Sequence, residues 1–291
     1  MINLMIMPNK ASEIDKLIEN ASALLLGIKD MSVNCLEIDF LELENISNTM
    51  HKRNKKVFVS LNKNIHNPDL KLLEIILKKC KELKIDGILY YDVAILNLNH
   101  KLSLDLPLVW SAEHLVTNYH TINYWAKFGA SYAFLANEIT KEEIFEITEN
   151  TNIPLIVQGF GYLPMYISRR HAISNYLNYF KLSSNTESYY LYKEDKKYPI
   201  LERKFGTEIY SNFILNAIEE SLEYKENKIE YILLSGFQIE EGKFERVIEL
   251  FTTVTENNKE SYKEEIDSMF SNTSQGFLYK ETIYQVKKNE K

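Results

Sequence analysis

Eight short apolar runs alternate with amphipathic segments along most of this 291-residue chain. The runs cover residues 2–7, 23–28, 56–61, 87–91, 106–110, 131–135, 154–158 and 230–234. Their length and their aliphatic and aromatic content are typical of buried strands. Because strands that alternate with helices form right-handed βαβ units, this pattern predicts a parallel sheet covered by helices.

The segments between the runs have helical periodicity. They cover residues 12–20, 42–54, 69–84, 120–128, 140–149 and 213–224, whereas the stretch 93–99 is short for a full helix. Thr140 and Glu143 predict a capping box at the start of the fifth segment. Gly129 is well placed to end the fourth.

Eight strand and helix units suit a closed (β/α)8 barrel of the TIM type. The alternative is a doubly wound open sheet, which usually has a glycine-rich phosphate turn after its first strand. The sequence after the first run, Met7-Pro8-Asn9-Lys10, contains no glycine. Since barrel enzymes place their functional residues at the C-terminal ends of the strands, we expect the polar residues that follow the runs to face one mouth. These are Asn9, Asn62, His66, Asp92, Ser111, Glu113, His114, Asn137, Glu138, Gln158 and Ser235.

A tyrosine-rich interval after the seventh run breaks the alternation. It contains Tyr189, Tyr190, Tyr192 and Tyr198. We interpret residues 181–210, approximately, as a β excursion that folds over the barrel mouth, within a barrel unit spanning residues 1–259. The tail, residues 260–291, is expected to pack on the barrel with one short helix and a strand-like segment at 277–286.

Positive charge is concentrated in one part of an acidic chain. The net charge is −7, yet residues 164–206 contain eight Lys and Arg against four Asp and Glu. The stretch 158–180, QGFGYLPMYISRRHAISNYLNYF, includes the adjacent Arg169 and Arg170. We interpret it as a loop that lines a cleft for an anion, because such residues are rarely buried without partners. The alternative is an ordinary solvated loop and helix start.

Composition excludes several classes of protein. There is no signal-like segment before the first run and no run near the length of a membrane span, about 18 apolar residues. Cys35 and Cys80 are interpreted as buried reduced thiols, which predicts a cytoplasmic protein. The pI near 5.5 argues against extensive coating of nucleic acid but allows a local basic patch.

Several segments, in order, resemble one known family. They are residues 55–66 (KKVFVSLN and a following histidine), 88–92 (ILYYD), 110–113 (W-S-x-E), 117–119 (T-N-Y), 136–140 (ANEIT), 158–176, 198–209 (YPILERKFGTEI) and 276–284. Together they are similar to the collagenase-like peptidases, the unassigned-type peptidase family thirty-two. The closest resemblance is to the small members found in Firmicutes-type bacteria.

The resemblance implies oxygen-independent hydroxylation of tRNA, ribosomal RNA or a quinone precursor. In such members cysteines near the diagnostic motif hold an iron-sulfur cluster. Here His171 and Asn216 stand near the places of two of these cysteines, and no cysteine follows Cys80. Gln158 and Glu208 also replace family histidines. We therefore expect no iron-sulfur cluster on this chain.

Three functions remain open. The first is a subunit of tRNA wobble-uridine hydroxylation that pairs with a cluster-bearing paralogue and binds a prephenate-like carboxylate or a phosphate through its arginines. In this case the tyrosines would stack an unpaired base, although packing within the inserted sheet is the simpler explanation for them. The second is a peptidase, for which Ser111 and His114 are a weak hint. The third is a metal-assisted hydrolase that uses His66, Asp92, Glu113, His114 and Glu138.

The candidate residues follow from these patterns. The catalytic candidates are Asp92, Glu113, His114 and Glu138. The ligand-binding candidates, drawn from the strand ends and the matched segments, are Asn62, His66, Ser111, Asn118, Gln158, Arg169, Arg170, Asn175 and Tyr176. Possible partners are tRNA, a small anion and the paralogue, with no membrane.

Overall fold

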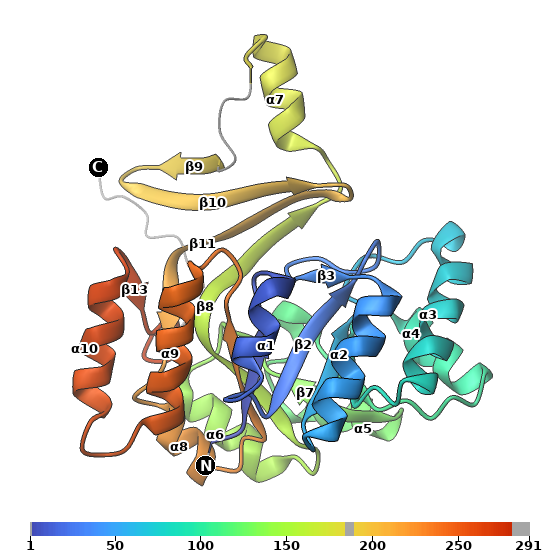
Figure 1. Cartoon of the computed structure of the whole chain (residues 1–291), viewed down its shortest axis with the longest axis horizontal. Coiled ribbons are helices and arrows are strands. Elements are labelled where there is room, and N and C mark those ends of the chain that lie inside the picture. The colour runs from blue at the N-terminus through green and yellow to red at the C-terminus, as the bar shows by residue number, and fades with distance from the viewer. Residues whose placement is uncertain (1, 184–188, 281–291) are drawn as a thin grey trace, which may run out of the picture.

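The computed structural model describes residues 2–183 and 189–280 of the chain. Eight parallel strands close into a barrel in the order β12, β1, β2, β4, β5, β6, β7 and β8, and β8 pairs back with β12 (Figure 1). Their bounds are β1 Leu4–Met7, β2 Ala23–Ile28, β4 Lys56–Ser60, β5 Gly87–Tyr90, β6 Leu108–Trp110, β7 Ala130–Phe134, β8 Leu155–Ser168 and β12 Tyr231–Ser235. Every predicted apolar run contributes one barrel strand. The barrel prediction is confirmed, and the open-sheet alternative is wrong.

Alternate side chains of the barrel strands pack on opposite faces of the sheet. Met5, Phe58 and Leu233 belong to a cluster that fills the barrel interior. Within it the Phe58 ring makes edge contacts with Tyr132 and Tyr231 at centroid distances of 5.6 and 5.5 Å. The intervening residues pack outward against the helices. Both strand faces are therefore buried, which explains why the runs are continuously apolar.

The helices cover the outside of the barrel. Their bounds are α1 Ile14–Leu17, α2 Phe40–Lys52, α3 Leu70–Glu82, α4 Val93–Lys101, α5 Tyr119–Lys127, α6 Lys141–Asn150, α7 Ala172–Phe180, α8 Ser221–Glu226, α9 Glu241–Thr253 and α10 Lys259–Met269. The predicted capping box of Thr140 and Glu143 is confirmed. Gly129, with φ of 105°, follows the end of α5 as predicted.

Three local predictions about these elements are wrong. The stretch 93–99 forms a complete helix, α4, because Asp92 caps it and Ile95 and Leu96 are buried. The helix expected over residues 213–224 is confined to α8, since the earlier residues extend β11, Gly206–Asn216. Residues 277–280, the described part of the expected tail strand, form a turn, and 281–286 lie outside the described residues. A two-residue strand, β13 Thr273–Ser274, lies beside β11 instead.

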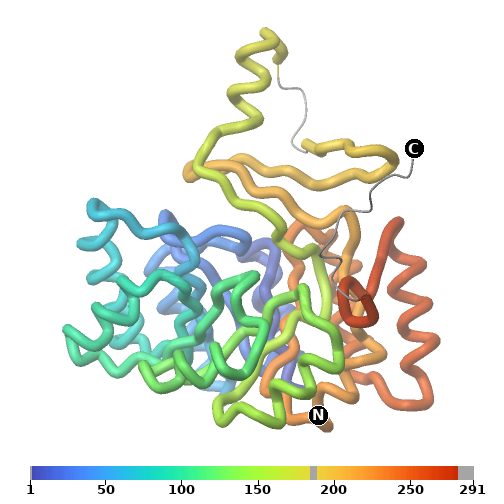
Figure 2. The backbone as a smooth tube through the Cα atoms, turned by 180° about the vertical axis from the view of Figure 1, so that it is seen from behind, coloured from blue at the N-terminus to red at the C-terminus, as the bar shows by residue number. Residues whose placement is uncertain are grey.

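The β excursion after the seventh barrel strand is confirmed, and it begins within β8. Beyond the barrel, β8 pairs with β11 in antiparallel fashion, and β11 pairs with β10 Lys196–Arg203 and β10 with β9 Tyr189–Lys193. The loop expected over residues 158–180 is therefore wrong: it is the distal half of β8 followed by α7. Figures 1 and 2 show this sheet above the barrel, with α7 standing farther out.

None of the helices in residues 2–183 and 189–280 is long and apolar enough to cross a membrane.

Candidate functional site

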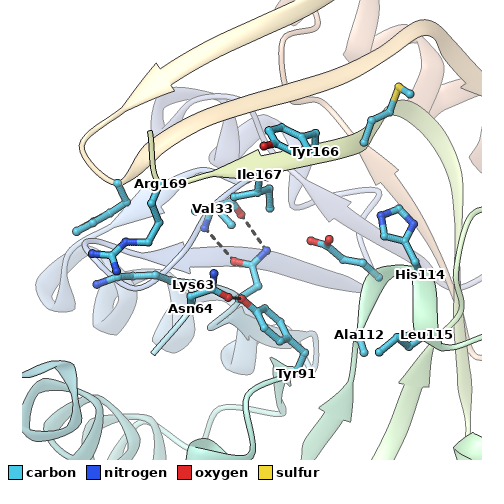
Figure 3. A pocket seen from close by; sticks show the side chains of 14 residues that line it. Val33, Lys63, Asn64, Tyr91, Ala112, His114, Leu115, Tyr166, Ile167 and Arg169 are labelled. Carbon is cyan, nitrogen blue, oxygen red and sulfur yellow. Dashed lines mark hydrogen bonds between the residues drawn. The ribbon is translucent and has the colours of Figure 1, made fainter. Parts of the chain in front are cut away.

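A cavity of about 430 Å³, here called the mouth cavity, opens at the C-terminal end of the barrel strands (Figure 3). Segments that follow β2, β4, β5 and β6 form one side, and the end of β8 forms the other. It is lined by Val33, Asn62, Lys63, Asn64, Tyr91, Ala112, Glu113, His114, Leu115, Met165, Tyr166, Ile167, Arg169 and Phe205. The site therefore lies where barrel enzymes place their chemistry.

One end of the mouth cavity is cationic. Arg169 Nη1 lies 2.6 Å from His66 Nε2, and Lys63 Nζ lies 3.1 Å from Asp69 Oδ1 and 4.1 Å from the Phe205 ring centroid. In Figure 3 the Lys63 and Arg169 side chains end on the same side of the cavity. Because a guanidinium only donates, the His66 nitrogen must accept, so this contact requires a neutral imidazole. Among the described residues Arg169 has no carboxylate partner, which leaves donors for an anion.

Asn62 forms a fixed polar wall of the cavity. Its Oδ1 accepts from Val33 N at 2.9 Å, and its Nδ2 donates to Val33 O at 3.1 Å (Figure 3). The Tyr91 hydroxyl donates to Asn64 Oδ1 beside it. These bonds join the loop after β2 to the loops after β4 and β5, so the wall is held in place before any ligand arrives.

The opposite end of the cavity carries acid and base groups. His114 Nδ1 lies 3.0 Å from Glu138 Oε1, which leaves Nε2 as the ring atom that can exchange a proton. Glu113 begins the short 3₁₀ turn Glu113–Leu115, and its backbone has φ of 41°. Although the residue is exposed as a whole, desolvation of its carboxyl raises the pKa, against the opposing charge of His114. A raised pKa suits a carboxyl for proton transfer.

A second, mostly apolar cavity of about 210 Å³, here called the side cavity, shares Glu113, His114 and Met165 with the mouth cavity. Its remaining lining residues are Ser111, Phe134, Leu135, Ala136, Asn137, Glu138, Gln158, Leu163, Pro164, Tyr198, Ser211, Asn212, Phe213 and Phe277. Gln158 accepts from Asn137 Nδ2 at 3.2 Å and donates to the carbonyls of Phe160 and Tyr162. The two cavities thus adjoin at Glu113, His114 and Met165, which line both.

A buried polar group at the barrel mouth is absent from the sequence-based candidates. Glu208 is only 2% exposed, and its carboxylate lies 2.7 Å from the Tyr210 hydroxyl and 3.6 Å from Arg203 Nε. Burial raises the pKa of Tyr210 well above its usual value, so its hydroxyl stays protonated and can donate. The inward alternation of Glu208 and Tyr210 along one strand is the sequence signal that could have identified them.

The structure brings only some of the sequence-based candidates together. Asn62, Glu113, His114 and Arg169 line the mouth cavity, and Ser111, Glu138 and Gln158 line the side cavity with Glu113 and His114.

The other candidates lie elsewhere. Asp92 accepts from the backbone of Ala94 and Ile65, and Asn118 caps α5. His66 contacts Arg169 without lining either cavity. Arg170 lines neither cavity, and Asn175 and Tyr176 lie on α7, beyond the excursion sheet (Figure 1).

The residues present do not fit a metal or cluster site of the expected kinds. Cys35 packs inside the barrel and Cys80 on its helical side, and burial raises the pKa of each thiol to about 12. A cluster held by cysteines needs several converging thiolates, which these two positions cannot supply. Within residues 2–183 and 189–280 no three His, Cys, Asp or Glu side chains are grouped to hold a metal ion, so the expected convergence of five such residues is not found.

The raised pKa of Glu113 gives a testable pH dependence. A carboxyl whose folded pKa exceeds its unfolded value, about 4.3, stabilises the fold below that value and loses this contribution as pH rises through the folded pKa. Glu113→Gln should therefore raise the melting temperature relative to wild type at pH 7, and the gain should vanish near pH 4. Thermal melts at both values check this, and a gain independent of pH would contradict it.

The sequence also matches known proteins. The sequence model of the family "Peptidase family U32" matches residues 10–288. The tRNA hydroxylation protein P2 of Bacillus subtilis is 30% identical, over 97% of this chain and 98% of that protein. The tRNA hydroxylation protein P of Escherichia coli is 28% identical over 45% of this chain and 29% of its own length. The solved structure of the U32 peptidase Mk0906 has a TM-score of 0.49 and 13% identity, over 81% of this chain and 92% of that one.

Proposed function

This chain belongs to peptidase family U32, and from that premise we propose that it is a component of oxygen-independent tRNA hydroxylation at the wobble uridine, with a small anion bound in the mouth cavity. The names of its relatives support the tRNA process. The observation that supports an anionic ligand is the position of Arg169. Its side chain lines the mouth cavity beside Lys63 and has no carboxylate partner among the described residues.

The chemistry of the cationic end suits a carboxylate or a phosphate. A guanidinium presents a planar pair of donors that matches a carboxylate or a phosphate, and Lys63 adds a second charge. Lys63 already forms an ion pair with Asp69, so Arg169 has more hydrogen-bond donors available for a ligand. A prephenate-like carboxylate is the ligand class that we propose.

A ligand anchored at Arg169 would extend toward the opposite end of the mouth cavity. There Glu113 and His114 would give or take a proton, with Glu138 holding His114 Nδ1 and thereby orienting its Nε2. The side cavity opens at the same point and would accept an apolar part of the ligand or substrate. We propose Glu113 and His114 as the proton-transfer pair and Glu138 as their positioning residue.

Any iron-sulfur chemistry in the process would require a partner, because the two cysteines of this chain are buried and far apart. We therefore propose a cytoplasmic hetero-oligomer with a cluster-bearing paralogue. A peptidase function has no comparable support. Ser111 lines the side cavity, yet the described structure shows no hydrogen bond between its hydroxyl and His114 that would activate a nucleophile.

Native mass spectrometry tests this assignment on the chain purified without oxygen from its own host. We expect a complex with a second protein, a small carboxylate on this chain, and iron and sulfide only on the partner. An isolated chain that carries its own stoichiometric cluster would contradict our assignment of the cysteines. A monomer without ligand or partner would contradict the proposed role.

A further inference from the structure

The outermost part of the molecule exposes an aromatic surface that nothing in the described structure covers. The helix α7 has no buried residue, and Tyr176, Tyr179 and Phe180 are 59%, 81% and 54% exposed. Their rings contact one another, with centroids 4.7 Å apart for Tyr176 and Phe180 and 4.9 Å for Tyr179 and Phe180. Exposed aromatic groups of this kind mark interaction sites. We call α7 together with the hairpin of β9 and β10 the arm.

The base of the arm is firmly attached, so the exposure does not reflect a loose end. The Glu202 carboxylate on β10 accepts from the backbone N–H groups of Ile173 and Ser174 and from the Ser174 hydroxyl. Thr207 Oγ1 accepts from Ala172 N at 2.9 Å and donates to the carbonyl of Arg170 at 2.7 Å. These bonds cap the first turn of α7 and fix its direction. The start of α7 is thus hydrogen-bonded to both β10 and β11.

Positive charge accompanies the aromatic rings. Lys181 follows α7, and Lys193, Lys196 and Lys197 lie on the hairpin beside Tyr190 and Tyr192, which is 71% exposed. None of these four lysines forms an ion pair with another described residue, and Lys197 Nζ lies 3.7 Å from the Tyr190 ring centroid. The hairpin, residues 189–203, contains four Lys and Arg against three Asp and Glu, and Glu194 and Asp195 lie in its turn. The arm's lysines are therefore the groups that can contact an anion.

Aromatic rings interleaved with lysines that have no ion-pair partner among the described residues favour RNA over a protein partner. Lysine is depleted in the buried cores of protein interfaces, whereas single-stranded RNA offers bases that stack on aromatic rings and phosphates that bind lysine. Paired RNA does not offer free base faces. We propose that the arm binds a single-stranded loop of RNA, whose bases stack on Tyr176, Tyr179, Phe180 and Tyr192 while the lysines contact its phosphates. Identifying this RNA as a tRNA anticodon loop rests on the proposed function.

The position of the arm links it to the mouth cavity. The strand β8 runs from the barrel wall past the mouth cavity, where Met165 and Ile167 line it, and continues directly into the arm (Figures 1 and 2). The arm therefore stands at the same end of the barrel as the mouth cavity. A loop bound on the arm would be held above the mouth, and an extruded base would have the mouth cavity below it.

Fluorescence anisotropy of the full chain with a labelled anticodon stem-loop tests the proposal, with a fully paired RNA hairpin as the comparison. Wild type should prefer the stem-loop. Tyr179→Ala should weaken its binding about 5- to 150-fold, the range for one stacked base, and Tyr179→Phe should keep it. Tyr124→Ala is the matched control, since Tyr124 is 55% exposed on α5, outside the arm. Lys196→Ala should reduce the slope of log K against log salt by about 0.7.

Equal affinity for the two RNAs, or an unchanged affinity of Tyr179→Ala with intact folding, would overturn the proposal. Loss of a protein partner in Tyr179→Ala with RNA binding intact would overturn it in favour of a protein interface. These outcomes are separate from failure of the proposed function. Carboxylate binding that depends on Arg169 can persist without the arm effect, and the arm effect can persist in a chain that binds no carboxylate.

Discussion

Arg169→Ala is expected to weaken carboxylate binding in the mouth cavity by about 1.5 to 3 kcal/mol, or about 10- to 150-fold, the range for hydrogen bonds to charged groups. The physical reason is the loss of the planar donor pair, which has no carboxylate partner in the part of the chain that the structure describes. Arg169→Lys should rescue poorly, because it keeps the charge and loses the fork. Calorimetric titration of the full chain with a prephenate-like dicarboxylate measures both effects.

The neighbouring arginine provides the matched control for this experiment. Arg170 is also exposed to solvent, just after the end of β8, but it lines neither cavity. Arg170→Ala should therefore bind the dicarboxylate as wild type does. Equal losses in both alanine variants would mean that general positive charge, and not the geometry at Arg169, attracts the ligand. A large fall in melting temperature for Arg169→Ala would assign the side chain to structure instead.

Phe58→Ala is expected to lower the free energy of unfolding by about 3 to 5 kcal/mol, the usual cost of removing a buried phenylalanine ring. Phe58 is fully buried inside the barrel between Tyr132 and Tyr231. Gly87 offers a test of the space that Phe58→Ala would create, since a Cβ at Gly87 would lie 2.4 Å from the Phe58 ring. Gly87→Ala alone should destabilise by overpacking, and it should cost less in the Phe58→Ala background, where its methyl group has space.

Chemical denaturation measures all three variants, with Phe128→Ala as the control. Phe128 is 45% exposed on the outside of the barrel, so its loss should be much smaller than that of Phe58. Strict additivity of the two barrel substitutions would contradict the packing described for the barrel interior.

The barrel was predictable because a strand that is buried on both faces appears in the sequence as a short continuous apolar run. The distal half of β8 contains no such run. Gly159, Gly161 and Pro164 indicate a turn in isolation, yet they belong to a strand that pairs with β11, far along the chain. Gly161 has φ of 110°, and a Cβ there would lie 2.5 Å from Ser235 O, so glycine permits close packing at this point of the strand. Only the pairing with β11 decides whether this segment forms a turn or a strand.

The candidate site was predictable in part for a similar reason. Strand ends in a parallel barrel meet at one mouth, so Asn62, Glu113, Glu138 and Gln158 could be grouped from their positions alone. The sequence could not separate Arg169 from Arg170, because that depends on how the end of β8 passes the mouth cavity. Asp92 is a strand-end residue as well, but its carboxylate is occupied by backbone N–H groups, a role that periodicity does not reveal.

The most direct measurement of the central claim is the level of hydroxylated wobble uridine in tRNA from the host that encodes this chain. Nucleosides from total tRNA would be quantified by mass spectrometry in a strain lacking the chain, and in strains restored with wild type, Arg169→Ala or Arg170→Ala. We predict that hydroxylation is lost without the chain, is restored by wild type and by Arg170→Ala, and stays low with Arg169→Ala. Unchanged hydroxylation in the strain that lacks the chain would contradict the proposed function.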